Sequence, residues 1–218
     1  PIKDYSFSLA ELEKSKKPIK ILAARDGLYK IENTPLGVFS VKVEYLNELD
    51  AIKEGFIPSI PKKIPKVILA QIITFFRDVA NRDDSYEAFA QVWWDKAEQD
   101  FYITVPPQKV SYDSLIYTLD VSVRDIMEVI DNKKTVDSIL VLSIHSHPTF
   151  PSEFSEVDLE NNQATGLYAV VGFINKSIPP ISLVMSCSGD YRKLPLSSIF
   201  ELPDSLTAQD FIADYPKE

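Results

Sequence analysis

The sequence predicts a mixed α/β (α+β) protein, with a small N-terminal β-rich module and a larger domain built on a sheet. Two observations predict the larger domain. Residues 66–81 carry apolar side chains at helical spacing, and VDSILVLSI (136–144) is nearly continuously apolar. An apolar run of this length is typical of a central strand that is covered on both faces. The alternation of apolar and polar residues between 19 and 45 predicts the β-rich module.

The β-rich module is expected to be a meander followed by a linker. IKILAA, LYKIEN and VFSVKVEY are strand-like, and Asp26-Gly27 and TPLG between them have turn composition. The segment GFIPSIPKKIPK (55–66) contains three prolines, which fix φ and remove backbone donors, so we expect an extended connector. We divide the chain into the module with its linker, a main domain and a polar C-terminal tail that frays, at 1–61, 62–203 and 204–218.

The main domain is expected to begin with the helix at 66–81, followed by a hairpin formed by 86–94 and 101–107. Of the adjacent Trp93 and Trp94 in this hairpin, one should be buried and the other exposed. Cys187 is expected to be a buried, inert thiol in a later strand. The other predicted elements are strands at 111–120, 136–144, 166–174, 180–187 and 189–194, and a helix at 155–165.

Composition excludes several classes of protein. A net charge of −9 argues against nucleic-acid binding, which normally requires a basic face. The single cysteine excludes an intramolecular disulfide and a CxxC motif, and this fits the reducing cytoplasm. The N-terminal residues lack the apolar core of a secretion signal, and VILAQIITFF (67–76) is too short to cross a bilayer. We expect a cytoplasmic protein without a nucleic-acid or membrane partner.

The two histidines of the chain lie in SIHSHPTFPSEFSEVD (143–158), where the apolar strand ends. Strand side chains alternate between faces, so His145 and His147 point the same way and can both reach one cation. The loop that follows contains prolines and serine and can fold back, which makes Asp158 the candidate third ligand. Two histidines and one carboxylate, with a fourth position left to water, form a catalytic zinc arrangement. Zinc lowers the pKa of water and polarises a carbonyl group.

A purely structural explanation exists for each half of this motif. Ser155-x-x-Asp158 is a capping box, with serine at the N-cap and an acid at N3, and taken alone it is better explained by capping. A His-x-His pair taken alone is also more often structural. The combination favours a site, because a cap needs no histidine and the chain has none elsewhere. The two explanations are compatible, since one oxygen of Asp158 can accept the capping bonds while the other binds a metal.

The spacing of the motif resembles the HxHx(7)SxxD signature of the JAMM (MPN+) zinc metalloproteases. This family cleaves isopeptide or peptide bonds, typically after the C-terminus of ubiquitin or a ubiquitin-like protein. The resemblance implies a curved mixed sheet flanked by helices, as in cytidine deaminase. It also implies one zinc ion, held by His145, His147 and Asp158. An essential glutamate on an early strand after the first helix, here Glu87, is implied as general base, and Ser155 as a hydrogen-bond donor to the oxyanion.

Further stretches, among them EAFAQVWWD and GLYAVVGFI, resemble a narrower group of this family, the A proteins of bacterial PRTRC gene clusters. These clusters also encode a ubiquitin-like protein, so the implied substrate is a ubiquitin-like protein or its conjugate. Insertions in the family help to hold the tail of the substrate. Residues 117–135 lack clear periodicity and stand at a comparable place, so we expect Val121–Lys134 to border the cleft and to be mobile without substrate.

Two other functions stay open. The first is a catalytically silent MPN-type binding module, although silent members usually lack one or more of the zinc ligands that are present here. The second is another hydrolase with a His-x-His pair, such as a phosphodiesterase or a deaminase. Those sites usually need further histidines and carboxylates, or a CxxC pair, which this chain does not supply.

Overall fold

The computed structural model describes residues 3–35, 37–44, 46, 56, 58–82, 86–106, 108–113, 116–120 and 138–215. The chain divides into two compact units, Pro1–Glu54 and Gly55–Glu218, each of which is described by itself. The expected cleft segment, Val121–Lys134, lies outside the described residues. No helix in the described part of the chain is long and apolar enough to cross a membrane.

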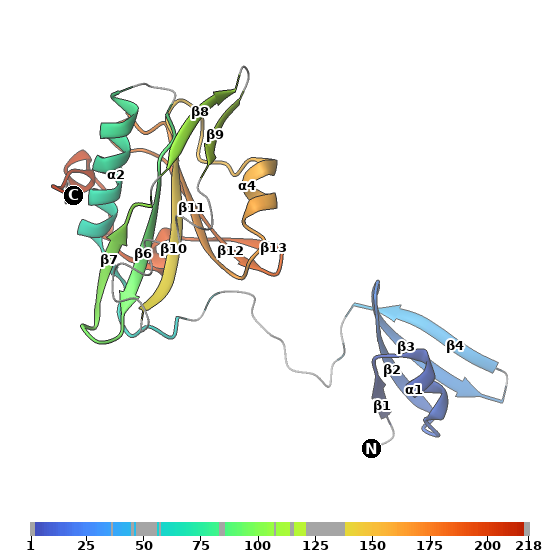
Figure 1. Cartoon of the computed structure of the whole chain (residues 1–218). Coiled ribbons are helices and arrows are strands. Elements are labelled where there is room, and N and C mark those ends of the chain that lie inside the picture. The colour runs from blue at the N-terminus through green and yellow to red at the C-terminus, as the bar shows by residue number, and fades with distance from the viewer. Residues whose placement is uncertain are drawn as a thin grey trace. The chain divides into compact units, whose positions relative to one another are not determined.

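The first unit is a four-stranded sheet with one short helix (Figure 1). Its strands β1 to β4 stand in sequence order, with β1 parallel to β2 and the remaining pairs antiparallel. The predicted meander is confirmed in β2, β3 and β4, whereas β1 and α1 were not predicted. A signal for α1 is present in the Ser8-x-x-Glu11 spacing. Ser8 Oγ accepts from Glu11 N–H, while Glu11 Oε2 accepts from Phe7 N–H rather than from Ser8 N–H as in a full capping box. The bounds are β1 Lys3–Ser6, α1 Leu9–Lys14, β2 Ile19–Ala24, β3 Gly27–Thr34 and β4 Gly37–Val43.

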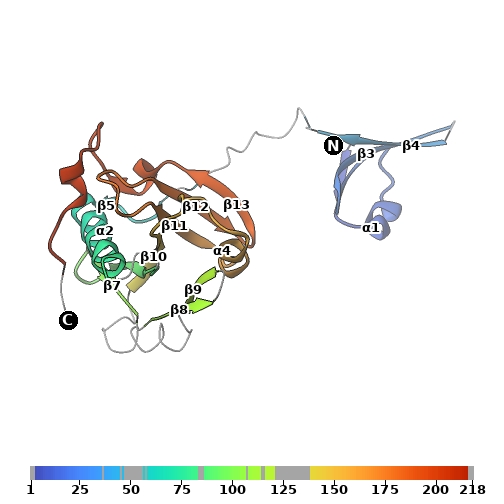
Figure 2. The ribbon, with the colours of Figure 1, turned by 90° about the horizontal axis from the view of Figure 1, so that it is seen from above.

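The second unit is built on a six-stranded mixed sheet in the order β13-β12-β11-β10-β6-β7. The β10–β11 pair is parallel and the other neighbours are antiparallel. Figures 1 and 2 show α2 and α4 on opposite sides of this sheet. The predicted mixed α/β class is therefore confirmed. The bounds are α2 Lys66–Ala80, β6 Phe89–Asp95, β7 Asp100–Thr104, β10 Ser138–His147, α4 Glu156–Asn161, β11 Gly166–Gly172, β12 Ile181–Cys187 and β13 Asp190–Leu194.

Smaller elements complete the second unit. The run predicted as one strand at 111–120 is instead divided between the two strands of an antiparallel hairpin, β8 and β9, in which Asp113 pairs with Ile116. Helix α4 is shorter than the predicted 155–165, because two consecutive asparagines, Asn161 and Asn162, are poor helix formers at its end. The bounds are β5 Ile64–Pro65, β8 Lys109–Asp113, β9 Ile116–Asp120, β14 Phe200–Glu201 and the 3₁₀ helices η2 Leu196–Ser198 and η3 Ala208–Phe211.

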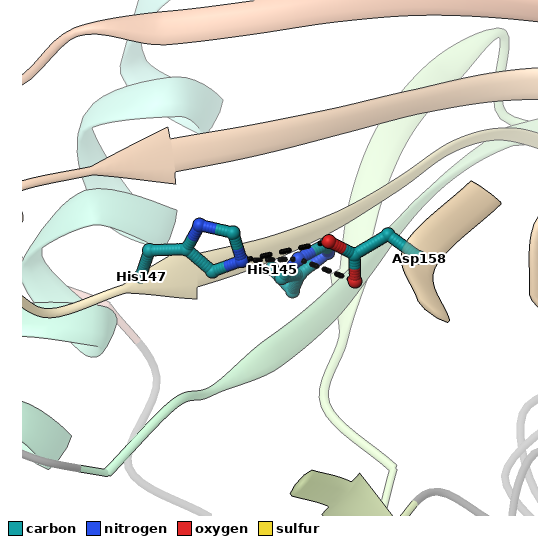
Figure 3. Close-up of side chains that lie close together, drawn as sticks. All are labelled: His145, His147 and Asp158. Carbon is teal, nitrogen blue, oxygen red and sulfur yellow. Dashed lines mark hydrogen bonds and ion pairs between the residues drawn. The ribbon is translucent and has the colours of Figure 1, made fainter. Parts of the chain in front are cut away.

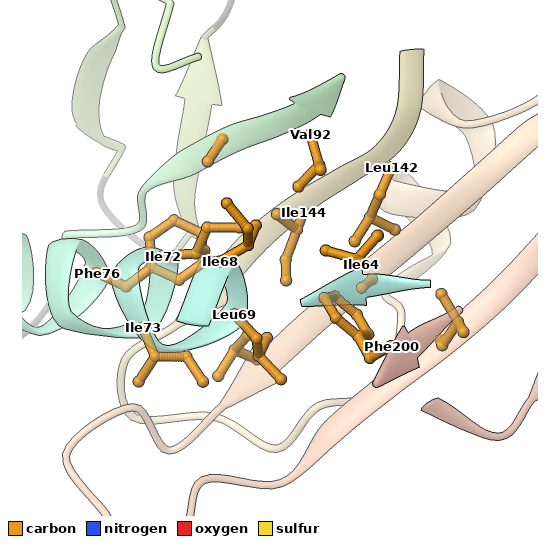
Figure 4. Close-up of a cluster of buried hydrophobic side chains, with 14 of the residues drawn as sticks. Ile64, Ile68, Leu69, Ile72, Ile73, Phe76, Val92, Leu142, Ile144 and Phe200 are labelled. Carbon is orange, nitrogen blue, oxygen red and sulfur yellow. The ribbon is translucent and has the colours of Figure 1, made fainter. Parts of the chain in front are cut away.

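The core lies between α2 and one face of the six-stranded sheet (Figure 4). Helix α2 contributes its buried face, and the strands contribute every second residue, among them Val92, Leu142 and Ile144. The prediction that β10 is covered on both faces holds only for its second half. Ile139 and Leu140, before a register shift in the pairing with β6, are 40% and 42% exposed.

Three expectations about single residues or segments are wrong. Trp93 and Trp94 are both buried, because Trp93 Nε1 donates to Thr104 Oγ1 over 3.0 Å on one face and Trp94 packs on Phe101 on the other. Cys187 is exposed, since it ends β12 beside the turn to β13. The tail does not fray over 208–215, because Phe211 is 1% exposed in the core, with its segment packed on α2.

Candidate metal centre

The two histidines lie at the end of β10 and point to the same side of the sheet (Figure 3). This end of β10 is held between β11 and β6, with His145 opposite Val170 on one side and Phe89 on the other. Both histidines are 8% exposed, and their Nε2 atoms are 3.2 Å apart. The strand periodicity expected from the sequence therefore brings the two imidazoles together as predicted.

Asp158 approaches the histidines from the first turn of α4. Its Oδ1 lies 3.2 Å from His145 Nε2, and its Oδ2 lies 3.6 Å from His147 Nε2 (Figure 3). Oδ2 also accepts hydrogen bonds from the backbone N–H and the hydroxyl of Ser155, at 2.8 and 2.7 Å. The Ser155 Oγ accepts in turn from Asp158 N–H, which completes the capping box. The cap thus holds Oδ2, which also faces His147, and leaves Oδ1 directed at His145.

The three side chains fit a tetrahedral zinc ion. Zinc binds nitrogen and oxygen ligands at about 2.0–2.2 Å, so ligands of a tetrahedral site lie roughly 3.3 Å from one another. The two Nε2 atoms lie 3.2 Å apart, Asp158 Oδ1 lies 3.2 Å from His145 Nε2, and the other oxygen, Oδ2, lies 3.6 Å from His147 Nε2. His145, His147 and Asp158 also form a group whose ligand atoms all lie within 4.8 Å of one another. Two neutral imidazoles and one carboxylate are borderline ligands that suit zinc.

A backbone carbonyl sets the tautomer of His147. The Nδ1 of His147 lies 2.9 Å from the carbonyl oxygen of Pro151, which can only accept a hydrogen bond. Nδ1 therefore carries the proton, and the lone pair of Nε2 is directed at Asp158 and His145. Metal-binding histidines usually have such a partner, because it fixes the ring and raises the basicity of the ligating nitrogen.

The loop that supplies this carbonyl packs directly on Gly172 at the end of β11. A Cβ atom at Gly172 would lie 2.3 Å from the Ser152 nitrogen and 2.4 Å from the Pro151 carbonyl carbon. The loop is also fixed by a hydrogen bond of 2.8 Å from Phe173 N–H to the Phe150 carbonyl. A side chain at position 172 would therefore displace the backbone that orients His147.

Glu87 reaches the cluster from the residues just before β6. Its Oε1 lies 3.9 Å from His147 Nε2, and its side chain is 15% exposed. The next residue, Ala88, is held in place by Ser146, which lies between the two histidines. Ser146 Oγ accepts from Ala88 N–H and Ser146 N–H donates to the Ala88 carbonyl, both over 2.9 Å. The strand that carries the histidines thus also fixes the approach of the glutamate.

The carboxylates of the cluster differ in their protonation. Burial raises the pKa of Glu87 to about 7, with the charge of Asp158 adding to the effect and His147 opposing it. Burial also disfavours ionisation of Asp158, but hydrogen bonds from His145, His147 and Ser155 outweigh it and hold the Asp158 pKa well below its ordinary value. Asp158 therefore stays ionised, whereas Glu87 can exchange a proton near neutrality.

The pKa of His147 is raised even though burial acts in the opposite direction. Its bonds to Asp158 and the Pro151 carbonyl, together with the charge of Glu87, outweigh the desolvation of the imidazolium. These groups favour the imidazolium form of His147, in which Nε2 also carries a proton. Metal binding must displace any proton held there, because the ligands bind zinc in their deprotonated form.

Ser155 lies at the edge of the site and is exposed. Its single hydroxyl proton is directed at Asp158 Oδ2 rather than outward. To donate to an oxyanion, as the sequence leads us to expect, the Ser155 hydroxyl must rotate its proton away from Asp158 Oδ2.

All five predicted site residues lie in or beside one cluster, and three other contributors were missed. Ser146, Gly172 and the carbonyl of Pro151 act through tertiary contacts that the motif does not contain. An isolated glycine in a strand often marks close backbone approach, so Gly172 left a signal in the sequence. A backbone carbonyl such as that of Pro151 leaves none.

Comparisons with known proteins add similarity of structure only. No protein-family model and no curated protein matches the sequence. A solution structure of a protein from Desulfitobacterium hafniense is 12% identical, with a TM-score of 0.43 over 64% of this chain and 93% of the other. A solution structure of a protein from Salinibacter ruber is 15% identical, with a TM-score of 0.37 over 62% of this chain and 90% of the other.

Proposed function

We propose that the protein is a zinc-dependent hydrolase of isopeptide or peptide bonds, of the JAMM (MPN+) type. The observation that carries this proposal is the meeting of His145, His147 and Asp158, whose ligand atoms lie within 4.8 Å of one another, with Glu87 beside them. A structural cap explains Ser155 and Asp158, but it does not explain two buried imidazoles facing a second, partly protonated carboxylate. The arrangement supports a metal site with a general base.

The architecture also supports this family. A mixed sheet with one parallel pair, a long helix on one face and a short helix on the site face is compatible with a JAMM or cytidine-deaminase-like fold. The HxHx(7)SxxD residues occupy the end of a central strand and the N-terminus of the short helix. Sequence motif and topology therefore support the same proposal from different observations.

The residues of the site have distinct chemical tasks in this proposal. A zinc ion held by His145, His147 and Asp158 would supply Lewis acidity for a water and a substrate carbonyl. Glu87, with its pKa raised toward neutrality, would take a proton from the attacking water and deliver it to the leaving amine. Ser155 would turn its hydroxyl from Asp158 to the developing oxyanion, while its backbone N–H keeps the bond to Asp158 Oδ2.

The substrate proposed is a ubiquitin-like protein, cut at its C-terminus from a peptide extension or a conjugate. This part rests on the resemblance to JAMM proteins and PRTRC A proteins. The other candidate, a silent binding module, is less favoured because the ligand set is complete and Glu87 lies within the reach of one bridging water.

The test is cleavage of a ubiquitin-like protein that carries a C-terminal peptide extension, preferably the one encoded beside this protein. Zinc-loaded wild type is compared with Glu87→Gln and with Glu98→Gln, a matched change at an exposed residue in the β6–β7 turn. Removal of a general base typically costs 10²- to 10⁴-fold, so Glu87→Gln should lose about that much activity and Glu98→Gln should resemble wild type.

Two controls separate this function from the alternatives. A chelator should abolish cleavage and added zinc should restore it, because the three ligands are present in full. Equal cleavage by wild type and Glu87→Gln would reject the assigned base. Stoichiometric zinc without cleavage, but with tight binding of the ubiquitin-like protein, would instead identify the silent binding module.

A further inference from the structure

A pocket of about 290 Å³ lies beside the metal centre, between α4 and the strands β12 and β13. Its volume is close to the lower end of the range for small-molecule sites. It is therefore large enough for one bulky side chain and too small for a folded domain. The lining residues are Glu153, Phe154, Leu159, Ser182, Val184, Tyr191 and Lys193.

The polar groups in the wall are largely engaged within the protein. The Tyr191 hydroxyl donates to the Leu159 carbonyl, and the Ser182 hydroxyl pairs with that of Ser152 over 3.0 Å. The remaining wall consists of the side chains of Phe154, Leu159 and Val184. Since the wall offers apolar surface and few free hydrogen-bonding groups, it favours an apolar occupant.

The rim adds little selectivity for charge. Glu153 and Lys193 are both exposed lining residues, and their charges are opposite. A cationic or an anionic occupant would be attracted by one of them and repelled by the other. Selection in this pocket should consequently depend on the size and apolarity of the side chain that enters.

The pocket and the metal centre share one side chain, that of Phe154. The ring of Phe154 lines the pocket and lies edge-on to His145, with 6.3 Å between ring centroids. Phe154 also directly precedes Ser155, the N-cap that holds Asp158.

We infer that this pocket is a specificity subsite, which binds one apolar side chain of the substrate close to the cut bond. The inference rests on the proposed peptidase function and deepens it. Leu159 and Val184 would set the size of the side chain that fits, because they come from opposite walls, α4 and β12.

The test uses the full-length, zinc-loaded protein and a library of internally quenched peptides in which each position around the cut is varied in turn. Val184→Trp, which fills the pocket, should reduce kcat/KM at least tenfold for large apolar residues at one position while alanine there changes little. Leu159→Ala, which enlarges the pocket, should shift the preference at that same position toward phenylalanine and tryptophan. Val67→Trp on α2, where Val67 is 50% exposed, is the matched control and should preserve the wild-type preference.

The outcomes distinguish this inference from the function on which it rests. Zinc-dependent cleavage with the same preference in wild type and Leu159→Ala would overturn the subsite and leave the peptidase intact. The Leu159→Ala result decides the question even when Val184→Trp does not fold. Failure of the zinc-loaded wild type to cleave any peptide or the ubiquitin-like fusion would reject the proposed function, and the subsite with it.

Discussion

The two faces of the six-stranded sheet serve different purposes. The face toward α2 is apolar and packed, with alternate residues of β6, β10 and β11 such as Val92, Ile144 and Val171 in the core. The opposite face carries His145 and His147 and most of the buried polar residues of the sheet, including Gln91, Thr104 and Ser186. Among the described residues, the two buried side-chain polar atoms without a partner, Gln91 Oε1 and Tyr102 Oη, lie on this second face.

The two faces of the sheet therefore contribute differently, one to the stability of the fold and the other to the chemistry of the site. Burial on the α2 face stabilises the fold, whereas burial on the site face changes the protonation of Glu87 and fixes the histidines. Substitutions on the first face should lower the free energy of unfolding. Substitutions on the second should alter activity or metal binding more than stability.

The largest expected effect on stability is that of Phe76→Ala on the α2 face. Phe76 is fully buried in the core, and its truncation should lower the free energy of unfolding by about 3–5 kcal/mol. Urea unfolding followed by tryptophan fluorescence reports on this unit alone, because both tryptophans of the chain lie in β6. The matched change Phe150→Ala, in the loop after β10 where Phe150 is 57% exposed, should cost no more than about 0.5 kcal/mol. Equal losses for both variants would contradict the division between the faces.

A smaller and opposite effect is expected for Glu87→Gln in the metal-free protein. The pKa of Glu87 is about 7 in the folded state and ordinary in the unfolded state, so the folded protein binds more protons between pH 4.5 and 7. The wild type should therefore lose roughly 2–3 kcal/mol relative to Glu87→Gln as pH rises through this window, with a constant difference above it. Urea unfolding at pH 5, 6, 7 and 8 measures this.

Zinc should reduce that difference, because a cation beside Glu87 favours its ionised form. If the metal-free wild type is as stable as Glu87→Gln at pH 8, burial does not destabilise the ionised form of Glu87.

A loss of stability smaller than that of Phe76→Ala, about 1–3 kcal/mol, is expected for Ser146→Ala. This change removes the acceptor of the buried Ala88 N–H and frees the segment that carries Glu87. Zinc binding should persist, because both histidines remain, while kcat falls more than tenfold. Ser146→Thr keeps the hydroxyl and should restore kcat, and Ser138→Ala at the start of β10 is the matched control. Loss of stability with unchanged kcat at full zinc loading would limit Ser146 to a structural role.

The parts of the site that could be predicted from the sequence are those set by local geometry. Strand alternation brings His145 and His147 together, and the capping box orients Asp158 from three residues away. Glu87 required the family resemblance, because no local period connects it with β10. The Pro151 carbonyl and the close approach of the loop to Gly172 depend on the pairing of β10 with β11, which single-sequence patterns do not specify.

The fold shows the same limit. Helix α2 and the strands of the main sheet follow from periodicity, whereas α1 and the division of 111–120 into β8 and β9 depend on short-range hydrogen bonds. Phe211 was missed because its burial results from docking of η3 on α2, far along the chain.

The central claim is that His145, His147 and Asp158 bind zinc beside Glu87. Diffraction from crystals of the zinc-loaded protein, measured on both sides of the zinc absorption edge, tests it directly. We predict one anomalous peak at about 2.0–2.2 Å from Nε2 of both histidines and from an Asp158 carboxylate oxygen, with Glu87 not coordinated. An absence of zinc at this cluster, or a zinc ion bound by Glu87 in place of Asp158, would contradict the assignment.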